Sequence, residues 1–260
     1  MNLNFYRNLI KQNLSKYIKP GDIIYIESDL TSFRKIFLLS KSKNNFLNFF
    51  FNIFSELVGK KGTIILPSFS YSWGDNEKKK IFDLNNSKSK TGILSEFLMK
   101  KKNVYRSLDP MFSCLIIGNK KKFLEVKNNT FGPNSIFEKL HKNNAKLVSF
   151  GLKRFDPTFV HYVEQYFDTN LKKINYRYLK KIIGIISINN KKYKDTFFTF
   201  LRNRKINKSY FEKRIKKDLI KSKKLKTLTV CDSKIYIVDS KNFFKIGIKG
   251  MKKNINYFAK

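Results

Sequence analysis

One of the two histidines in the sequence has a neighbour that suits proton transfer. His161 is followed three residues later by Glu164, and on a helix this spacing places both side chains on one face. Because an imidazole titrates close to neutral pH, His161 is a candidate general base that Glu164 orients directly or through water. Thr158 precedes the pair and is a candidate donor to a developing oxyanion. The alternative is that His161 caps or packs at a helix start and Glu164 is a surface carboxylate.

The other possible metal ligands are dispersed along the chain. His141 ends a helical pattern, where a cation suits a helix C-terminus. Cys114 and Cys231 lack the close spacing of a zinc site or of a disulfide framework. The apolar run 46–58 is too short to cross a bilayer. We therefore expect no metal, no transmembrane segment and a reducing, cytoplasmic location.

Strand and helix patterns that could position these residues alternate along the chain. The predicted strands are 22–27, 63–66, 112–117, 146–150, 182–188, 227–230 and 235–238. The predicted helices, after an amphipathic helix within 1–19, are 44–58, 92–99, 120–126, 135–141 and 158–167, with a capping box at Ser135 and Glu138. Beyond Asn189 the alternation fades into basic helical stretches such as 210–224 and short strands. The pattern predicts one α/β domain over 1–260, with helices on both faces of a sheet.

Polar segments marked by Pro and Gly follow several predicted strands, at 27–29, 67–69 and from Gly151 onward. Ligands of open α/β sheets bind at such an edge. The segment 106–110 instead precedes its strand, so it reaches the same edge only if strand 112–117 runs antiparallel to its neighbours. We therefore expect a mixed sheet.

The formal net charge of +36 points to a polyanionic partner such as nucleic acid. The alternative is a lysine-rich solvated surface, because Lys, Asn, Ile and Phe are abundant together, as a strongly AT-rich genome would produce. The sequence has no zinc-finger spacing, no RNA-recognition aromatic motif and no helix-turn-helix signature. We therefore expect no specific nucleic-acid partner, although a basic, non-enzymatic nucleic-acid-binding protein stays the alternative from another class.

Four segments, in their order and spacing, resemble the aminoglycoside 3-N-acetyltransferase family. They are GTIILPSF at 62–69, RSLDPMFS at 106–113, FGPNSIFEKL at 131–140 and VHYVE at 160–164. The resemblance covers about residues 21–180. It implies a three-layer α/β/α sandwich with a mixed central sheet, here followed by a smaller C-terminal strand- and helix-containing part. It also implies an acetyl-coenzyme A-dependent N-acetyltransferase in which His161 activates an amine on a sugar.

Two positions depart from the family pattern. Glu27 stands where the family usually has the His of His-Ser-Ser-Leu, and Asp109 stands where it usually has the His of Arg-Ser-x-His-Pro. The Asp109 variant resembles the branch associated with surface-polysaccharide sugars, which favours a nucleotide-linked amino sugar over an aminoglycoside antibiotic. The net charge favours the same substrate, because an aminoglycoside is a polycation. A family member that has lost activity and only binds acyl carriers is a further alternative.

The remaining candidate residues suit the two substrates that the resemblance implies. Phosphates and an amide-rich arm call for an arginine with neighbouring hydroxyls, so Ser28, Arg106, Ser107 and Ser113 are predicted to bind coenzyme A, whereas Arg106 in a salt bridge is the alternative. The aromatic and acidic side chains predicted to bind the sugar are Tyr71, Asp75, Asp83 and Glu96. Trp73, in the same loop, is either part of that surface or a half-buried anchor, and Glu96 could instead face solvent.

Overall fold

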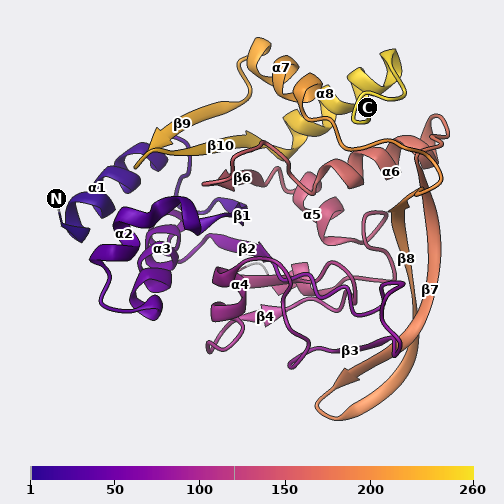
Figure 1. Ribbon diagram of the computed structural model, residues 1–260, viewed down its shortest axis with the longest axis horizontal. Coiled ribbons are helices and arrows are strands. Elements are labelled where there is room, and N and C mark those ends of the chain that lie inside the picture. The colour runs from indigo at the N-terminus through magenta and orange to yellow at the C-terminus, as the bar shows by residue number, and fades with distance from the viewer. Residues whose placement is uncertain (1, 120) are drawn as a thin grey trace.

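The computed structural model describes residues 2–119 and 121–260. Its strands form a seven-stranded sheet in the order β4-β5-β2-β1-β6-β10-β9 and a three-stranded sheet in the order β3-β7-β8 (Figure 1). The strands are β1 Ile23–Ser28, β2 Thr63–Pro67, β3 Ile81–Asp83, β4 Tyr105–Arg106, β5 Cys114–Gly118, β6 Lys146–Phe150, β7 Arg177–Ile188, β8 Lys191–Arg202, β9 Lys226–Val230 and β10 Ser233–Asp239. The helices are α1 Leu3–Leu14, η1 Leu30–Phe33, α2 Arg34–Leu39, α3 Lys43–Val58, α4 Ile93–Leu98, η2 Lys121–Leu124, α5 Ile136–Lys142, α6 Val160–Asn170, α7 Lys213–Lys221 and α8 Ser240–Lys253.

The main sheet is mixed, as predicted. β1 runs parallel to both β2 and β6 at its centre. β5 pairs antiparallel with β2, so that Cys114 at the start of β5 lies opposite Pro67 at the end of β2. The segment that precedes β5 therefore reaches the edge at which β1 and β2 end.

Successive residues of the central strands face two different helical layers. Ile24 and Val148 pack in a core with α1 to α4, whereas Tyr25 and Leu147 pack in a core with α5 to α8. Strand side chains alternate between the two faces of a sheet, so a central strand that is buried on both faces needs a helical layer on each. The predicted three-layer α/β/α sandwich is confirmed.

The predicted apolar helix at 44–58 is α3, which lies in the core. The Ser42 hydroxyl accepts a hydrogen bond from the Asn45 N–H at its start, and Gly59 follows its end with a φ of 62°. Along the described residues, no helix has both the length and the apolar character that a membrane span requires. The predicted helix 120–126 begins at a residue outside the described ones, and η2 accounts for 121–124 of it.

The part of the chain after Asn189 is more regular than the sequence indicates. β7 and β8 form a long curved hairpin whose turn residues, Asn189 and Asn190, both have positive φ angles, which suits a tight hairpin turn (Figure 1). β9 and β10 join the main sheet beside β6, and α7 and α8 cover it. The C-terminal strands and helices are therefore integrated into the sandwich.

Candidate active site

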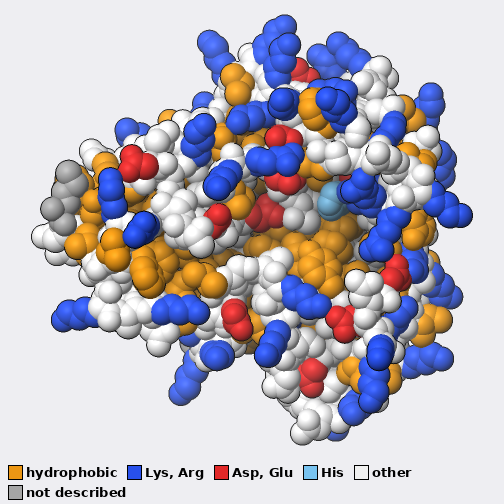
Figure 2. Space-filling model, viewed as in Figure 1, with side chains coloured by type: hydrophobic (Ala, Val, Ile, Leu, Met, Phe, Trp, Pro, Cys, Tyr) orange, Lys and Arg blue, Asp and Glu red, His pale blue; other side chains and the backbone are white. Residues whose placement is uncertain are grey.

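A cavity of about 470 Å³ opens at the edge of the main sheet where β1 and β2 end. Figure 2 shows a hollow in the middle of this face, with apolar and acidic side chains in it and Lys and Arg side chains around the periphery. The walls come from these strand ends and the residues that follow them, from α4 and the segment before it, and from the loop after β6. They are Ile26, Glu27, Ser28, Asp29, Pro67, Phe69, Tyr71, Thr91, Gly92, Ser95, Leu152, Lys153, Arg154, Asp156 and Thr158.

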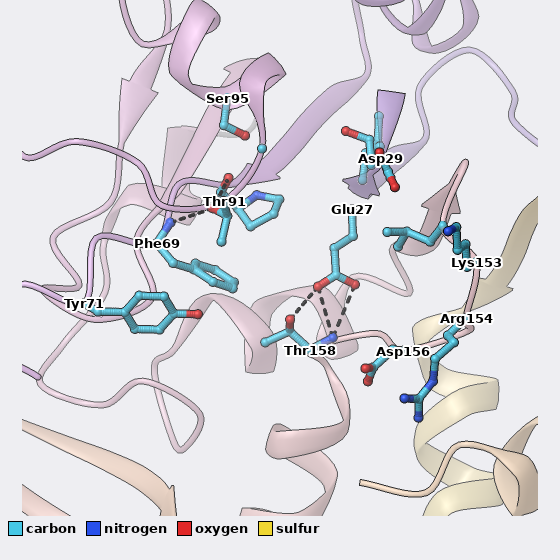
Figure 3. Close-up of a pocket in the computed structure, with 15 residues that line it drawn as sticks. Glu27, Asp29, Phe69, Tyr71, Thr91, Ser95, Lys153, Arg154, Asp156 and Thr158 are labelled. Carbon is cyan, nitrogen blue, oxygen red and sulfur yellow. Dashed lines mark hydrogen bonds between the residues drawn. The ribbon is translucent and has the colours of Figure 1, made fainter. Parts of the chain in front are cut away.

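Glu27 extends from the end of β1 toward Thr158 in this cavity (Figure 3). The Thr158 N–H donates to the two Glu27 carboxylate oxygens at 3.1 and 3.3 Å, and the Thr158 hydroxyl donates to Oε1 as well. Burial raises the pKa of Glu27 to about 7 against the lowering effect of these hydrogen bonds. Glu27 is therefore partly protonated near neutral pH, whereas Thr158 has both of its donors engaged. An oxyanion role for Thr158 requires Glu27 to release one of them.

His161 and Glu164 meet near the start of α6, in the contact that their spacing predicts. His161 Nδ1 lies 2.9 Å from Glu164 Oε2, and the Glu164 side chain is only 2% exposed. The alternative in which Glu164 is a surface carboxylate is therefore wrong. Burial lowers the pKa of His161, Arg177 lowers it further, and the hydrogen bond and charge of Glu164 oppose both effects. The imidazole is therefore suited to accept a proton at neutral pH.

Arg177, at the start of β7, completes this cluster and was not predicted from the sequence. Its Nε lies 2.7 Å from Glu164 Oε2, and its Nη2 lies 3.4 Å from His161 Nε2. A third guanidinium nitrogen donates to the Phe200 carbonyl of β8 at 3.4 Å. No local spacing singles out one arginine among 55 basic residues, and the contact depends on the fold that brings β7 to α6.

The His161 cluster is connected to the cavity through the segment that starts α6. Within the described part of the chain, the cavity lining includes Thr158 but not His161. The His161 N–H donates to the Thr158 carbonyl at 3.1 Å. A row of ring contacts also runs from Tyr71 in the cavity wall through Phe112 and Phe131 to the imidazole, with centroid separations of 5.3, 4.8 and 5.2 Å. The His161 imidazole thus lies next to the cavity wall, beyond Thr158.

Three of the residues predicted to bind coenzyme A lie in a buried cluster. Arg106 donates to the Ser113 hydroxyl at 3.0 Å, to the Ser68 carbonyl at 2.7 Å and to the Ser87 carbonyl. Burial lowers the pKa of its guanidinium to about 10. The Ser107 hydroxyl accepts from the Cys114 N–H at 2.9 Å. The hydrogen bonds of this cluster connect the strands and the turn around it. Of the four residues predicted to bind coenzyme A, only Ser28 lines the cavity in the part of the chain that the structure describes.

The predicted sugar-binding residues are also separated by the fold. Tyr71 lines the main cavity, and together with Asp75 it also lines a second cavity of about 310 Å³. Asp75 forms an ion pair with Lys180. Asp83 accepts the backbone N–H groups of the turn that follows it and the Ser187 hydroxyl, and Glu96 is exposed on α4.

Trp73 and Asp109, two positions that stood out in the sequence, are both buried and hydrogen-bonded to the backbone. Trp73 is fully buried and donates from Nε1 to the Ile185 carbonyl at 3.3 Å, which supports the interpretation as a loop anchor. Asp109 is buried and accepts from the Met111 and Phe112 N–H groups at 2.8 Å each. The family departure at Asp109 thus caps a turn beside β5. Among residues 2–119 and 121–260, no three His, Cys, Asp or Glu side chains gather in a way that could hold a metal ion.

Comparisons with known proteins agree with this architecture. The AAC-IIIb structure, solved as a binary complex with CoASH, has a TM-score of 0.74 and 17% identity, covering 95% of this chain and 96% of that one. AAC-VIa with bound sisomicin has a TM-score of 0.75 and 16% identity, covering 97% and 98%. The YokD protein from Bacillus subtilis has a TM-score of 0.72 and 17% identity, covering 95% and 94%.

At these identities the structures establish the fold, and no curated protein sequence matches the chain. The family itself is shown by the sequence model of the aminoglycoside 3-N-acetyltransferases, which matches residues 31–252. That match includes all four segments in full, the cavity walls from Pro67 onward, and the three residues of the His161 cluster. Fold and sequence model together show that the chain belongs to the aminoglycoside 3-N-acetyltransferase family of N-acetyltransferases.

Proposed function

We propose that this chain transfers the acetyl group of acetyl-coenzyme A to the amine of an amino sugar, with His161 as the general base. The observation that carries the proposal is the buried contact between His161 and Glu164 next to a cavity at the sheet edge. An amine attacks a thioester only as the free base. Once Arg177 releases His161 Nε2, this nitrogen would accept a proton from the attacking amine. Glu164 would stabilise the imidazolium, and the imidazolium would return the proton to the departing sulfur.

The cavity walls fit the chemistry of the acetyl donor. Pro67 and Phe69 give apolar surface for the pantetheine arm, and Ser28 gives a hydroxyl at the end of β1. Lys153 is exposed at the same cavity, where an ammonium group suits the phosphates, whereas Arg154 is paired with Glu212. A structural neighbour with CoASH bound supports this donor. The buried placement of Arg106, Ser107 and Ser113 favours a role in supporting the walls over direct contact with the donor.

For the acceptor, we propose a nucleotide-linked amino sugar that serves a surface polysaccharide. The support is the net charge of +36, which attracts a sugar diphosphonucleotide, and the variant at Asp109 that resembles the polysaccharide-associated branch. A specific observation favours the second candidate, an aminoglycoside: the cavity contains the carboxyl groups of Glu27, Asp29 and Asp156. A neighbour with bound sisomicin points the same way. Local carboxylates can outweigh the long-range field, because salt screens it over about 8 Å.

Steady-state kinetics on a panel of aminoglycosides and nucleotide-linked amino sugars tests both levels of the proposal. Release of free thiol from acetyl-coenzyme A in the presence of an acceptor would support the acetyltransferase activity. A higher kcat/KM for any aminoglycoside than for every nucleotide-linked sugar would overturn the preferred acceptor and leave the activity intact. Binding of acetyl-coenzyme A without turnover on any amine would instead identify a protein that only binds acyl carriers.

A further inference from the structure

We infer that Arg177 is a positioning residue for the proposed general base: it holds His161 as the neutral imidazole that carries its proton on Nδ1 and leaves Nε2 unprotonated. The inference rests on the proposed function of His161, because it explains how that side chain is prepared to take a proton. Its structural basis is the contact of one guanidinium with both members of the pair, at 2.7 Å to Glu164 and 3.4 Å to His161.

The choice of tautomer follows from which groups can donate. An arginine has only donors, so the imidazole nitrogen that faces Arg177 must be an acceptor. An ionised carboxylate has only acceptors, so the imidazole nitrogen that faces Glu164 must carry the hydrogen. The two contacts are satisfied together by the Nδ1–H tautomer. The opposite tautomer would place an N–H against a guanidinium and a lone pair against a carboxylate.

The protonation state follows from the balance of charge in the cluster. With a neutral His161, the positive charge of Arg177 balances the negative charge of Glu164. Without Arg177, the buried carboxylate would have no cation beside it, and a proton on the imidazole would be the nearest way to supply one. Arg177 therefore lets Glu164 orient the imidazole without making it an imidazolium before the amine arrives.

The other titratable groups around the cluster do not provide this balance. Tyr176, which enters β7, and Tyr210, which precedes α7, both lie within the electrostatic range of Glu164. Burial raises the pKa of both phenols, so they stay neutral over the working range of pH. Phe131, the ring that packs against the imidazole, carries no charge. Arg177 and Glu164 are thus the charged side chains that the structure records against His161.

The test is an NMR titration of the two histidines in the full chain. The native protein should show His161 with a protonated Nδ1 and an unprotonated Nε2. In R177Q the pKa of His161 should rise, and the acidic limb of the pH profile of kcat/KM should move upward with it. The matched control is R202Q, because Arg202 lies opposite Arg177 in the β7–β8 ladder but is exposed. R177K keeps the positive charge and should restore most of the native titration.

The outcomes separate this inference from the proposed function. An unchanged His161 pKa in a folded R177Q, or an equal shift in R202Q, would overturn the role of Arg177. If R177Q does not fold, the tautomer in the native protein still decides, because a proton on Nε2 contradicts the inference directly. The NMR tautomer and the NMR pKa need no turnover, so a failure to find the acceptor would not affect these two readouts. An active H161A variant would remove the base and leave the titration result standing.

Discussion

Glu27 and Glu164 are two carboxyl groups near the sheet edge that have different kinds of hydrogen-bond partner. Glu27 receives hydrogen bonds from Thr158 and, at 3.4 Å, from the Tyr25 hydroxyl, all of them neutral donors, and burial still raises its pKa to about 7. Glu164 contacts the guanidinium of Arg177, which balances its charge. Neutral hydrogen bonds offset only part of the cost of burying a charge, whereas a cation in direct contact supplies a balancing charge.

The largest expected effect on kcat comes from replacing His161, the side chain that Glu164 contacts. H161A should lower kcat by about 100-fold or more, which is the usual contribution of a general base, while calorimetry shows near-normal binding of acetyl-coenzyme A. H141Q is the matched control, because His141 contacts Tyr162 and Phe244 away from the cavity. Unchanged turnover in H161A would remove this side chain from the mechanism and leave Glu27, in the cavity wall, as a candidate base.

A smaller loss is expected when the charge of Glu164 is removed but its shape is kept. E164Q retains an oxygen that accepts from Nδ1 but loses the charge that stabilises the imidazolium, so kcat should fall about tenfold, the equivalent of about 1.4 kcal/mol. E138Q is a control on α5, where Glu138 forms a surface ion pair with Lys142. If E164Q kept full kcat, the charge of Glu164 would have no part in catalysis. The difference between Glu164, which pairs with Arg177, and Glu27, which has only neutral donors, would then not bear on the reaction.

At Glu27 the same substitution should change the pH dependence of stability. The pKa of Glu27 is raised from 4.5 to about 7 in the folded state, so its contribution to stability is complete below the unfolded pKa and is lost as pH rises to the folded one. E27Q should therefore gain stability relative to the native chain between these values, by at most about 3 kcal/mol because Glu27 is only partly buried. Urea unfolding at several pH values measures the difference.

A control with the opposite sign is available on the surface. The hydrogen bond from Lys11 lowers the pKa of Glu56, so its stabilisation is present above its ordinary pKa and is lost as pH falls. E56Q should therefore be less stable than the native chain at neutral pH, and this difference should disappear in acid. E27Q should show the opposite trend, with a gain in stability as pH rises. A parallel pH dependence of E27Q and E56Q would contradict the burial of Glu27 as the cause.

The smallest effect is expected where a carboxylate is exposed and paired. Asp75 has a side chain that is 46% exposed and pairs with Lys180 on β7, so D75N should change the free energy of unfolding by less than about 0.5 kcal/mol. The predicted contact of Asp75 with the sugar is tested by the same variant. A rise in KM for the acceptor at unchanged kcat would place Asp75 on the substrate, whereas unchanged KM would confine the acceptor to the cavity with Glu27.

The sequence predicted the elements whose signals are local. The central strands, α3 and the contact of His161 with Glu164 each follow from a run, a period or a spacing within a few residues. β8 and α8 were missed because the first begins with lysines and a tyrosine on a curved ribbon with irregular burial, and the second repeats lysines between its apolar positions. A fold that depends on such segments is completed by tertiary contacts.

The site shows the same division between local and distant contacts. Motif position placed Arg106 and Ser113 correctly at the sheet edge, but it could not indicate that their side chains point into a buried cluster. Glu27 was noticed as a departure from the family pattern, yet its partner Thr158 is 131 positions away in the chain. Arg177 carried no signal at all, because its contacts depend on where β7 begins relative to α6.

The two edge strands of the main sheet affect how copies of this chain behave in concentrated solution. β4 offers only the two residues Tyr105–Arg106 for pairing, and β9 begins at the exposed Lys226, just after Lys223 and Lys224. Short and lysine-flanked edges discourage the addition of a strand from another molecule, and the net charge of +36 keeps copies apart. That protection is electrostatic, so concentrated salt weakens it. Colloidal stability should therefore decline as ionic strength rises, and dilute buffers free of polyanions suit storage of the protein.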